Sequence, residues 1–94
     1  MRFTWDKLKA EQNLRKHRIA FVDAARVFAD PLAIRKQDRV EDGEERWQII
    51  GVIESFKLVV VAHTSYEDDN GEETIRIISA RKAERSERRD YEDG

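Results

Sequence analysis

Three runs of β-branched and aromatic residues between positions 46 and 82 constrain the fold of this chain most. "RWQIIGVIE" and "KLVVVAHTSY" are separated only by Ser55 and Phe56, and "TIRIISARK" follows the acidic stretch "EDDNGEE". Strand-forming runs with such short connections pair as consecutive antiparallel hairpins. Ser-Phe lacks the glycine or asparagine that two-residue turns favour, so we expect a wider or distorted turn there. Asn70-Gly71 indicates a second, longer hairpin loop.

Upstream of these runs, the spacing of apolar residues indicates a short strand at 3–5, two helices and another short strand beginning at Leu32. Asp6 occupies the N-cap position of the first helix, "KLKAEQNLRKH". In the second helix, apolar residues recur at i, i+3, i+4 and i+7, and Pro31 prevents its continuation. Residues 81–92 have the composition of a helix. The order predicts an α+β fold: a small antiparallel β-sheet packed with two N-terminal helices and a C-terminal helix.

The size and composition of the chain suit one small domain, residues 1–94, with a thin core. Charged residues make up 40% of the sequence and apolar residues 39%, so a partner that adds buried surface is expected. Without cysteine, disulfides and thiolate metal sites are excluded. No apolar run approaches the length of a membrane span, and the first residues do not resemble a signal peptide. These features predict a cytoplasmic protein with no membrane contact.

Basic and acidic segments alternate along the chain, although its net charge is only −2. Residues 1–36 contain nine Lys/Arg against four Asp/Glu, whereas 38–45 and 67–73 contain five acids each. Basic elements between acidic loops would attract phosphate with a defined orientation. The alternative is that the acidic stretches are merely solvated turns.

Strand pairing predicts which polar side chains share a face of the sheet. If Glu54 faces Lys57, then Gln48 faces His63 and Arg46 faces Ser65; if Tyr66 faces Glu73, then His63 faces Arg76. Side chains alternate between faces along a strand. The polar face then contains Arg46, Gln48, His63 and Arg76, and the main core contains Trp47, Ile49, Leu58, Val60, Ala62, Ile75 and Ile77.

A histidine beside arginines suggests cleavage of RNA by its own 2′-hydroxyl group. A neutral imidazole accepts a proton near physiological pH, and guanidinium groups hold a phosphate and stabilise its growing charge. The candidate catalytic residues are His63, Arg76 and Arg81, with Lys9 and His17 as contributors. The alternative is that His63 is a half-buried strand residue, that the arginines pair with acidic loops, and that His17 simply favours the helix dipole.

The C-terminal segment contains a second basic feature. On a helix, Arg81, Arg85 and Arg88 would share one side, with Lys82 and Arg89 just beside it. Such a ridge suits a phosphate backbone, but it is also typical of a solvated helix with weak surface ion pairs. Two histidines 46 positions apart form no ligand motif, so no metal and no cofactor are expected.

Several segments resemble the BrnT family of toxins, and the resemblance extends from Phe3 to Glu92. They are "FTWDKLKAEQNLRKHRIAFVDAARVFADP", "DGEERWQIIG", "LVVVAHT" and "IRIISARKAERSERRDYE". The resemblance implies a RelE-like ribonuclease fold and a role as the toxin of a type II toxin–antitoxin pair. It also implies RNA cleavage without a metal, neutralisation by a BrnA-like ribbon-helix-helix antitoxin, and binding of promoter DNA by the complex.

Within this family the basic ridge and Arg46 would bind RNA or an acidic segment of the antitoxin. A second hypothesis is a protein without catalysis that only locks the antitoxin into a DNA-binding complex. A stand-alone nucleic-acid module is disfavoured, because such modules are commonly basic overall. Two positions depart from the family pattern: Arg18 replaces a glycine that usually ends the first helix, and Ala20 replaces a hydroxyl cap.

Overall fold

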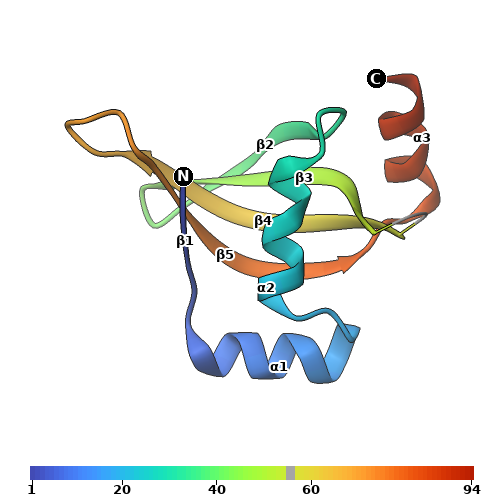
Figure 1. The fold of residues 1–94 in the computed structure, drawn as a ribbon, viewed down its shortest axis with the longest axis horizontal. Helices are drawn as coiled ribbons and strands as arrows, with labels where there is room; N and C mark the ends of the chain where they lie inside the picture. Colours follow the sequence, from blue (N-terminus) through green and yellow to red (C-terminus); the bar gives the residue numbers. More distant parts are fainter. Residues whose placement is uncertain (55–56) are drawn as a thin grey trace.

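The computed structural model describes residues 1–54 and 57–94, and its main feature is a five-stranded sheet in the order β1-β5-β4-β3-β2 (Figure 1). In chain order the elements are β1 (Arg2–Thr4), α1 (Lys7–His17), α2 (Phe21–Ala24), the 3₁₀ helix η1 (Ala25–Ala29), β2 (Ile34–Glu41), β3 (Glu44–Glu54), β4 (Lys57–Glu67), β5 (Glu73–Lys82) and α3 (Arg85–Asp93). The predicted α+β class is confirmed. The sheet is mixed, because β1 pairs with β5 in parallel. The predicted distorted turn at 55–56 lies outside the described residues.

The connection between β2 and β3 is much tighter than the acidic loop expected at 38–45. β2 continues to Glu41 and β3 begins at Glu44, so only Asp42 and Gly43 form the turn. Both have positive φ, 53° and 78°, which is the conformation that matches the twist of a two-residue hairpin. Asp-Gly is the usual sequence for such a turn, and the surrounding acidic residues concealed this signal.

The main core lies between one face of the sheet and the helices α2 and η1, which cross that face in Figure 1. Gly51 of β3 allows this close approach, because a Cβ there would lie 2.8 Å from Val27 Cγ2 and 3.0 Å from an Asp30 carboxylate oxygen. The core contains Ile19, Phe21, Ala24, Val27, Ile49, Ile53, Val59, Val61, Ile75, Ile77 and Ala80. We call this side of the sheet the helix face, and the opposite side the outer face.

The outer face is covered at one end by α3. Ile50, Leu58 and Val60 form a second apolar cluster there, against Val52, Ala83 and Tyr91. Asp30 connects this end to the rest of the fold, because its Oδ2 accepts hydrogen bonds from Val52 N (2.9 Å) and Tyr91 Oη (2.7 Å). In the part of the chain that the structure describes, no helix has the length and apolar content needed to cross a membrane.

The observed register moves His63 away from the polar face on which it was predicted. Glu54 does face Lys57, but the register shifts between Val52 and Glu54, so Trp47 rather than Gln48 faces His63. In the second hairpin Glu67, rather than Tyr66, faces Glu73, and this one-residue difference at the turn places His63 opposite Ile77. The register shift between Ala62 and His63 lies beyond that pair and affects only the residues from Ala62 and Ser79 onward.

The predicted grouping of four polar residues is therefore wrong in its most important member. His63 belongs to the helix face, whereas Arg46, Gln48 and Arg76 lie on the outer face by strand alternation. Leu58, Val60 and Ala62 likewise belong to the outer face rather than the main core. The bulge between Val52 and Glu54 and the one-residue difference in pairing at the second turn each exchange the two faces relative to the prediction.

Helix α1 begins and ends with identifiable caps. Asp6 is its N-cap, as predicted, and its side chain accepts a hydrogen bond from Lys9 N at 2.9 Å. Arg18 ends the helix in the left-handed conformation, with φ 62° and ψ 26°, and its N–H donates to Leu14 O. This is the conformation in which glycine is favoured, so Arg18 is strained at this position.

We expect Arg18→Gly to stabilise the protein by about 0.5–1 kcal/mol, because it removes the left-handed penalty at the cost of some chain entropy. The matched control is Arg15→Gly, in the body of α1, which should destabilise the protein by about 1 kcal/mol. Urea unfolding followed by circular dichroism measures both changes. Destabilisation by Arg18→Gly would show that the arginine side chain contributes more than its backbone strain costs.

Candidate functional site

A cleft of about 310 Å³ between α1 and β5 has a basic lining that includes a histidine. Its residues from α1 recur at helical spacing and therefore project from one side of the helix. Those from β5 are Ile78 and Ser79, which lie at the bulge of that strand. The cleft is lined by Lys9, Gln12, Asn13, Lys16, His17, Ile78 and Ser79.

Asn13 holds α1 against β5 and so forms the cleft. Its Nδ2 donates to Ala80 O (2.9 Å) and Ile19 O (3.1 Å), and its Oδ1 accepts from Ala80 N (3.0 Å). The side chain is only 7% exposed, and it is the one buried residue of α1. The amide thus pairs with both backbone groups of Ala80, as a neighbouring strand would.

Arg76 and Arg81 both lie on the outer face of β5, on either side of Ser79. They face Thr64 and Val60, while Ser79 faces Ala62, and these three residues of β4 alternate to the same side. The two arginine positions are four residues of β4 apart, or about 13 Å along the strand. The two arginines therefore share a face of the sheet, although Arg81 had been expected on the C-terminal helix. The imidazole that lines the adjacent cleft is that of His17.

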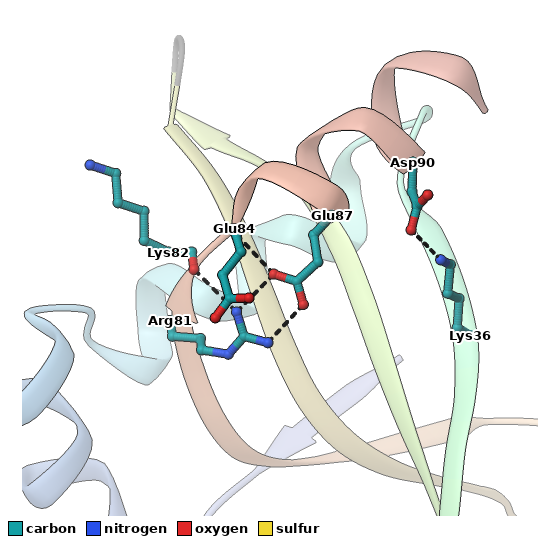
Figure 2. Close-up of polar contacts among 6 residues, drawn as sticks. All are labelled: Lys36, Arg81, Lys82, Glu84, Glu87 and Asp90. Atoms are coloured by element: carbon teal, nitrogen blue, oxygen red, sulfur yellow. Dashed lines mark hydrogen bonds and ion pairs between the residues drawn. The ribbon is translucent and has the colours of Figure 1, made fainter.

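Arg81 is held in a two-pronged ion pair by Glu87 of α3 (Figure 2). Its two terminal nitrogens lie 2.8 and 2.7 Å from the two carboxylate oxygens. The hydrogen bonds from Arg81 lower the pKa of Glu87, against the opposing effect of burial. Glu87 Oε1 also accepts from Glu84 N at 2.9 Å, which ties the start of α3 to the same carboxylate.

The other arginines of the outer face also contact carboxylates. Arg76 lies 2.5 Å from Glu44, and Arg46 lies 3.1 Å from Glu41. The hypothesis that the arginines pair with the acidic stretches is therefore confirmed for this pair of arginines. By contrast, within residues 1–54 and 57–94, neither Lys9 nor Lys16 forms an ion pair. The lysines of α1 thus offer positive charge that no carboxylate neutralises at contact distance.

The basic ridge predicted on one helix is divided between two elements. β5 extends to Lys82, so Arg81 and Lys82 belong to a strand, and α3 begins at Arg85. Figure 2 shows Lys82 extending away from the Arg81–Glu87 pair. Arg85, Arg88 and Arg89 are exposed on α3. The predicted alignment of Arg81 with Arg85 and Arg88 on one helix side is wrong. The helix-like composition begins at Arg81, but β5 continues to Lys82 and the helix starts only at Arg85.

His63 is completely buried on the helix face, with its ring 5.0 Å from that of Phe28 in an edge-to-face arrangement. Its Nδ1 lies 3.3 Å from Thr64 O, and because a carbonyl only accepts, the neutral ring carries its proton on Nδ1. Nε2 has no hydrogen-bond partner among the described residues. Burial lowers the pKa of His63 to about 4. The predicted meeting of His63 with Arg76 is therefore absent, and the two side chains lie on opposite faces.

Lys9 and His17, which sequence reasoning had named as contributors, do lie together in the cleft. Gln12, Lys16 and Ser79 were not predicted as site residues. The i, i+4, i+7 spacing of Lys9, Asn13 and Lys16 along α1 indicated that Lys16 lies on the same side of the helix as Lys9. Nothing in the sequence indicated Ser79, because its place in the cleft depends on the bulge in β5.

Comparisons with known proteins agree with this architecture. A family model described as a ribonuclease toxin, BrnT, of type II toxin–antitoxin systems matches residues 5–87. The crystal structure of the Brucella abortus ribonuclease toxin BrnT superposes with a TM-score of 0.69 at 22% sequence identity, covering 90% of this chain and 99% of that one. No curated protein matches the sequence.

We expect Asn13→Ala to destabilise the protein by about 2–3 kcal/mol, because it leaves buried backbone groups of Ala80 and Ile19 without partners. Gln12→Ala, at the neighbouring exposed position of α1, is the control and should change stability by less than about 0.5 kcal/mol. Urea unfolding measures both. Equal stabilities for the two variants would contradict the anchoring role of Asn13.

Stability should also depend on pH through His63. Its pKa is lower in the folded protein than in the unfolded chain, so the folded state resists its protonation. The contribution is complete above about pH 6.5 and is lost as the pH falls toward 4, at roughly 1.4 kcal/mol per pH unit. We expect unfolding free energies measured between pH 7.5 and 5 to show this slope in the wild type and to lack it in His63→Leu. An unchanged slope in the variant would mean that other groups cause it.

Proposed function

The chain belongs to the BrnT family of ribonuclease toxins of type II toxin–antitoxin systems, and on this premise we propose that it cleaves RNA in the cleft between α1 and β5, without a metal. The observation that carries the proposal is the lining of that cleft. Two lysines that form no ion pair among the described residues project, together with an imidazole, from one side of α1 toward the bulge of β5. Four other clefts, including those at Arg26 and Asp30 and at Trp5 and Phe21, have no histidine in their lining.

The proposed reaction uses the substrate's own 2′-hydroxyl as the nucleophile. A base removes its proton, the oxygen attacks the adjacent phosphorus, and the bond to the 5′-oxygen breaks. The products are a 2′,3′-cyclic phosphate and a 5′-hydroxyl, which receives a proton from a general acid. Such a step needs proton transfer and stabilisation of negative charge on the phosphate, and side chains supply both.

In this proposal His17 transfers the proton and the lysines hold the phosphate. Lys9 and Lys16 lie on the same side of α1 as His17 and provide the cationic lining. Arg81, on the outer face beside Ser79, becomes a phosphate ligand when the phosphate replaces the carboxylate of Glu87. Both anions present paired oxygens to the guanidinium fork, so they can exchange. Arg76 extends the same strip of positive charge along β5.

His63 has a structural role in this proposal. A completely buried imidazole with a pKa of about 4 cannot reach RNA without local opening of the core. Its contact with Phe28 instead packs η1 on the sheet. The imidazole that the cleft presents to solvent is that of His17.

The proposed biological setting is the cytoplasm, with a cognate antitoxin of the BrnA-like ribbon-helix-helix type. The toxin arrests growth when it is free, and the complex binds its own promoter DNA through the antitoxin. A non-catalytic role, in which the chain only locks the antitoxin into that complex, is the second candidate. The carboxylates that pair with Arg46, Arg76 and Arg81 favour this non-catalytic role, because RNA would have to displace these carboxylates to reach the arginines.

We expect Lys16→Ala and His17→Ala each to lower the rate of RNA cleavage by about a hundredfold or more, by loss of phosphate binding and of proton transfer. Lys7→Ala is the matched control, because Lys7 lies on the other side of α1, outside the cleft. Purified toxin is assayed on radiolabelled RNA in EDTA, and the 2′,3′-cyclic phosphate end is identified.

Full cleavage by a folded His17→Ala variant would remove His17 from the mechanism. Cleavage that stops in EDTA would contradict metal independence. Absence of cleavage by the wild type, together with a stable antitoxin complex, would favour the non-catalytic role.

A further inference from the structure

The side of α1 that faces away from the RNA cleft forms a second groove, with α2, of about 260 Å³. Several large apolar side chains line it while remaining open to solvent. Trp5 is 38% exposed, Leu14 47% and Val22 64%. The groove is lined by Trp5, Lys7, Ala10, Glu11, Leu14, Ala20, Phe21 and Val22.

This apolar surface is not explained by the fold itself. Asn13 is the one buried residue of α1, so the helix is attached through a polar side chain and leaves its leucines outside the core. Trp5 stacks edge-on against Phe21, with ring centroids 6.0 Å apart, and so forms a rigid wall of the groove. Contiguous exposed apolar groups on a small protein mark an interaction surface.

The rim of the groove is basic. Lys7 lines the groove and is exposed, and the exposed Arg15 and Arg18 line an adjoining hollow that shares Glu11 and Leu14 with the groove. Within the described residues, none of these three cations takes part in an ion pair. The arginines of the outer face, in contrast, contact carboxylates. The rim therefore offers unneutralised positive charge beside an apolar floor.

We propose that this groove binds an amphipathic helix of the antitoxin, with apolar residues against Trp5, Leu14 and Val22 and acidic residues along the basic rim. A helix presents apolar side chains at i, i+3 and i+4 to such a groove, and flanking carboxylates match the cations. The inference rests on the proposed function only in taking the antitoxin as the partner. It adds where that partner binds and which chemistry recognises it.

The two sides of α1 then have separate tasks. Lys9, Lys16 and His17 face the RNA cleft, while Leu14 faces the groove. The antitoxin can anchor on the groove without contacting the cleft residues. A toxin with a damaged groove should therefore retain RNA cleavage and escape neutralisation.

The test compares antitoxin binding by wild-type toxin and a Leu14→Ser/Val22→Ser double variant, using isothermal titration calorimetry with the purified cognate antitoxin. We expect Kd to rise about a hundredfold in the double variant, because two central apolar contacts are lost. Leu32→Ser is the matched control, since Leu32 is 68% exposed but lies outside the groove. Its Kd should equal that of the wild type.

A second arm tests the basic rim. Lys7→Glu/Arg15→Glu should weaken antitoxin binding about tenfold or more and should flatten the dependence of Kd on salt concentration. Circular dichroism and thermal unfolding establish that each variant is folded. An unchanged Kd in a folded double variant of either kind would overturn the proposal.

Two further measurements distinguish antitoxin binding from binding of a second toxin copy in the groove. They also distinguish a failure of this inference from a failure of the proposed function. If the toxin alone forms dimers by light scattering, and Leu14→Ser/Val22→Ser makes it a monomer with unchanged antitoxin affinity, the groove binds a second copy and the proposal is wrong. RNA cleavage is assayed on the same preparations. Inactive wild-type toxin whose antitoxin binding still depends on Leu14 and Val22 would refute the ribonuclease mechanism while supporting the groove.

Discussion

The pairing of the Asn13 side-chain amide with the backbone of Ala80 is the interaction on which the functional surfaces depend. β1 covers the first part of the free edge of β5, up to Arg76, and Asn13 satisfies the edge further along. Asn13 is the one fully buried residue of α1, and with the partly buried Ala10 it sets the position of the helix on the sheet. Both the RNA cleft and the apolar groove are consequences of that position.

Asp30 plays the corresponding part at the other end of the molecule. Burial opposes its ionisation, but hydrogen bonds from Val52 N–H, the Tyr91 hydroxyl and Leu32 N–H keep its pKa below the ordinary value. The same contact raises the pKa of Tyr91 to about 12. The Asp30 carboxylate thus joins the end of η1 to β3 and α3. It holds α3 in the position where Glu87 accepts hydrogen bonds from the guanidinium of Arg81. Whether Arg81 is free to bind a phosphate is therefore linked to the docking of the last helix.

The β-bulges decide which side chains can act together. Counting from the turns placed His63 beside Gln48 and Arg76, and the hairpins do form. In the first hairpin a register shift between Val52 and Glu54 moves the pairs by one residue, and in the second the pairing starts at Glu67–Glu73 instead of Tyr66–Glu73. His63 consequently lies in the core against Phe28, while Arg76 and Arg81 remain on the outer face. Such shifts depend on how strands twist under packed helices, which local sequence patterns do not encode.

The amino-acid sequence by itself determined the α+β class, the hairpin order of β3 to β5, the N-cap at Asp6 and the family, because these depend on local spacing and residue type. It also placed Lys9 and His17 on one side of a helix. Only the tertiary structure decided that this side meets Ser79, and that carboxylates hold the arginines of the outer face. These features require side chains distant in the sequence to meet, and their meeting depends on register, bulges and the few contacts that anchor α1 and α3.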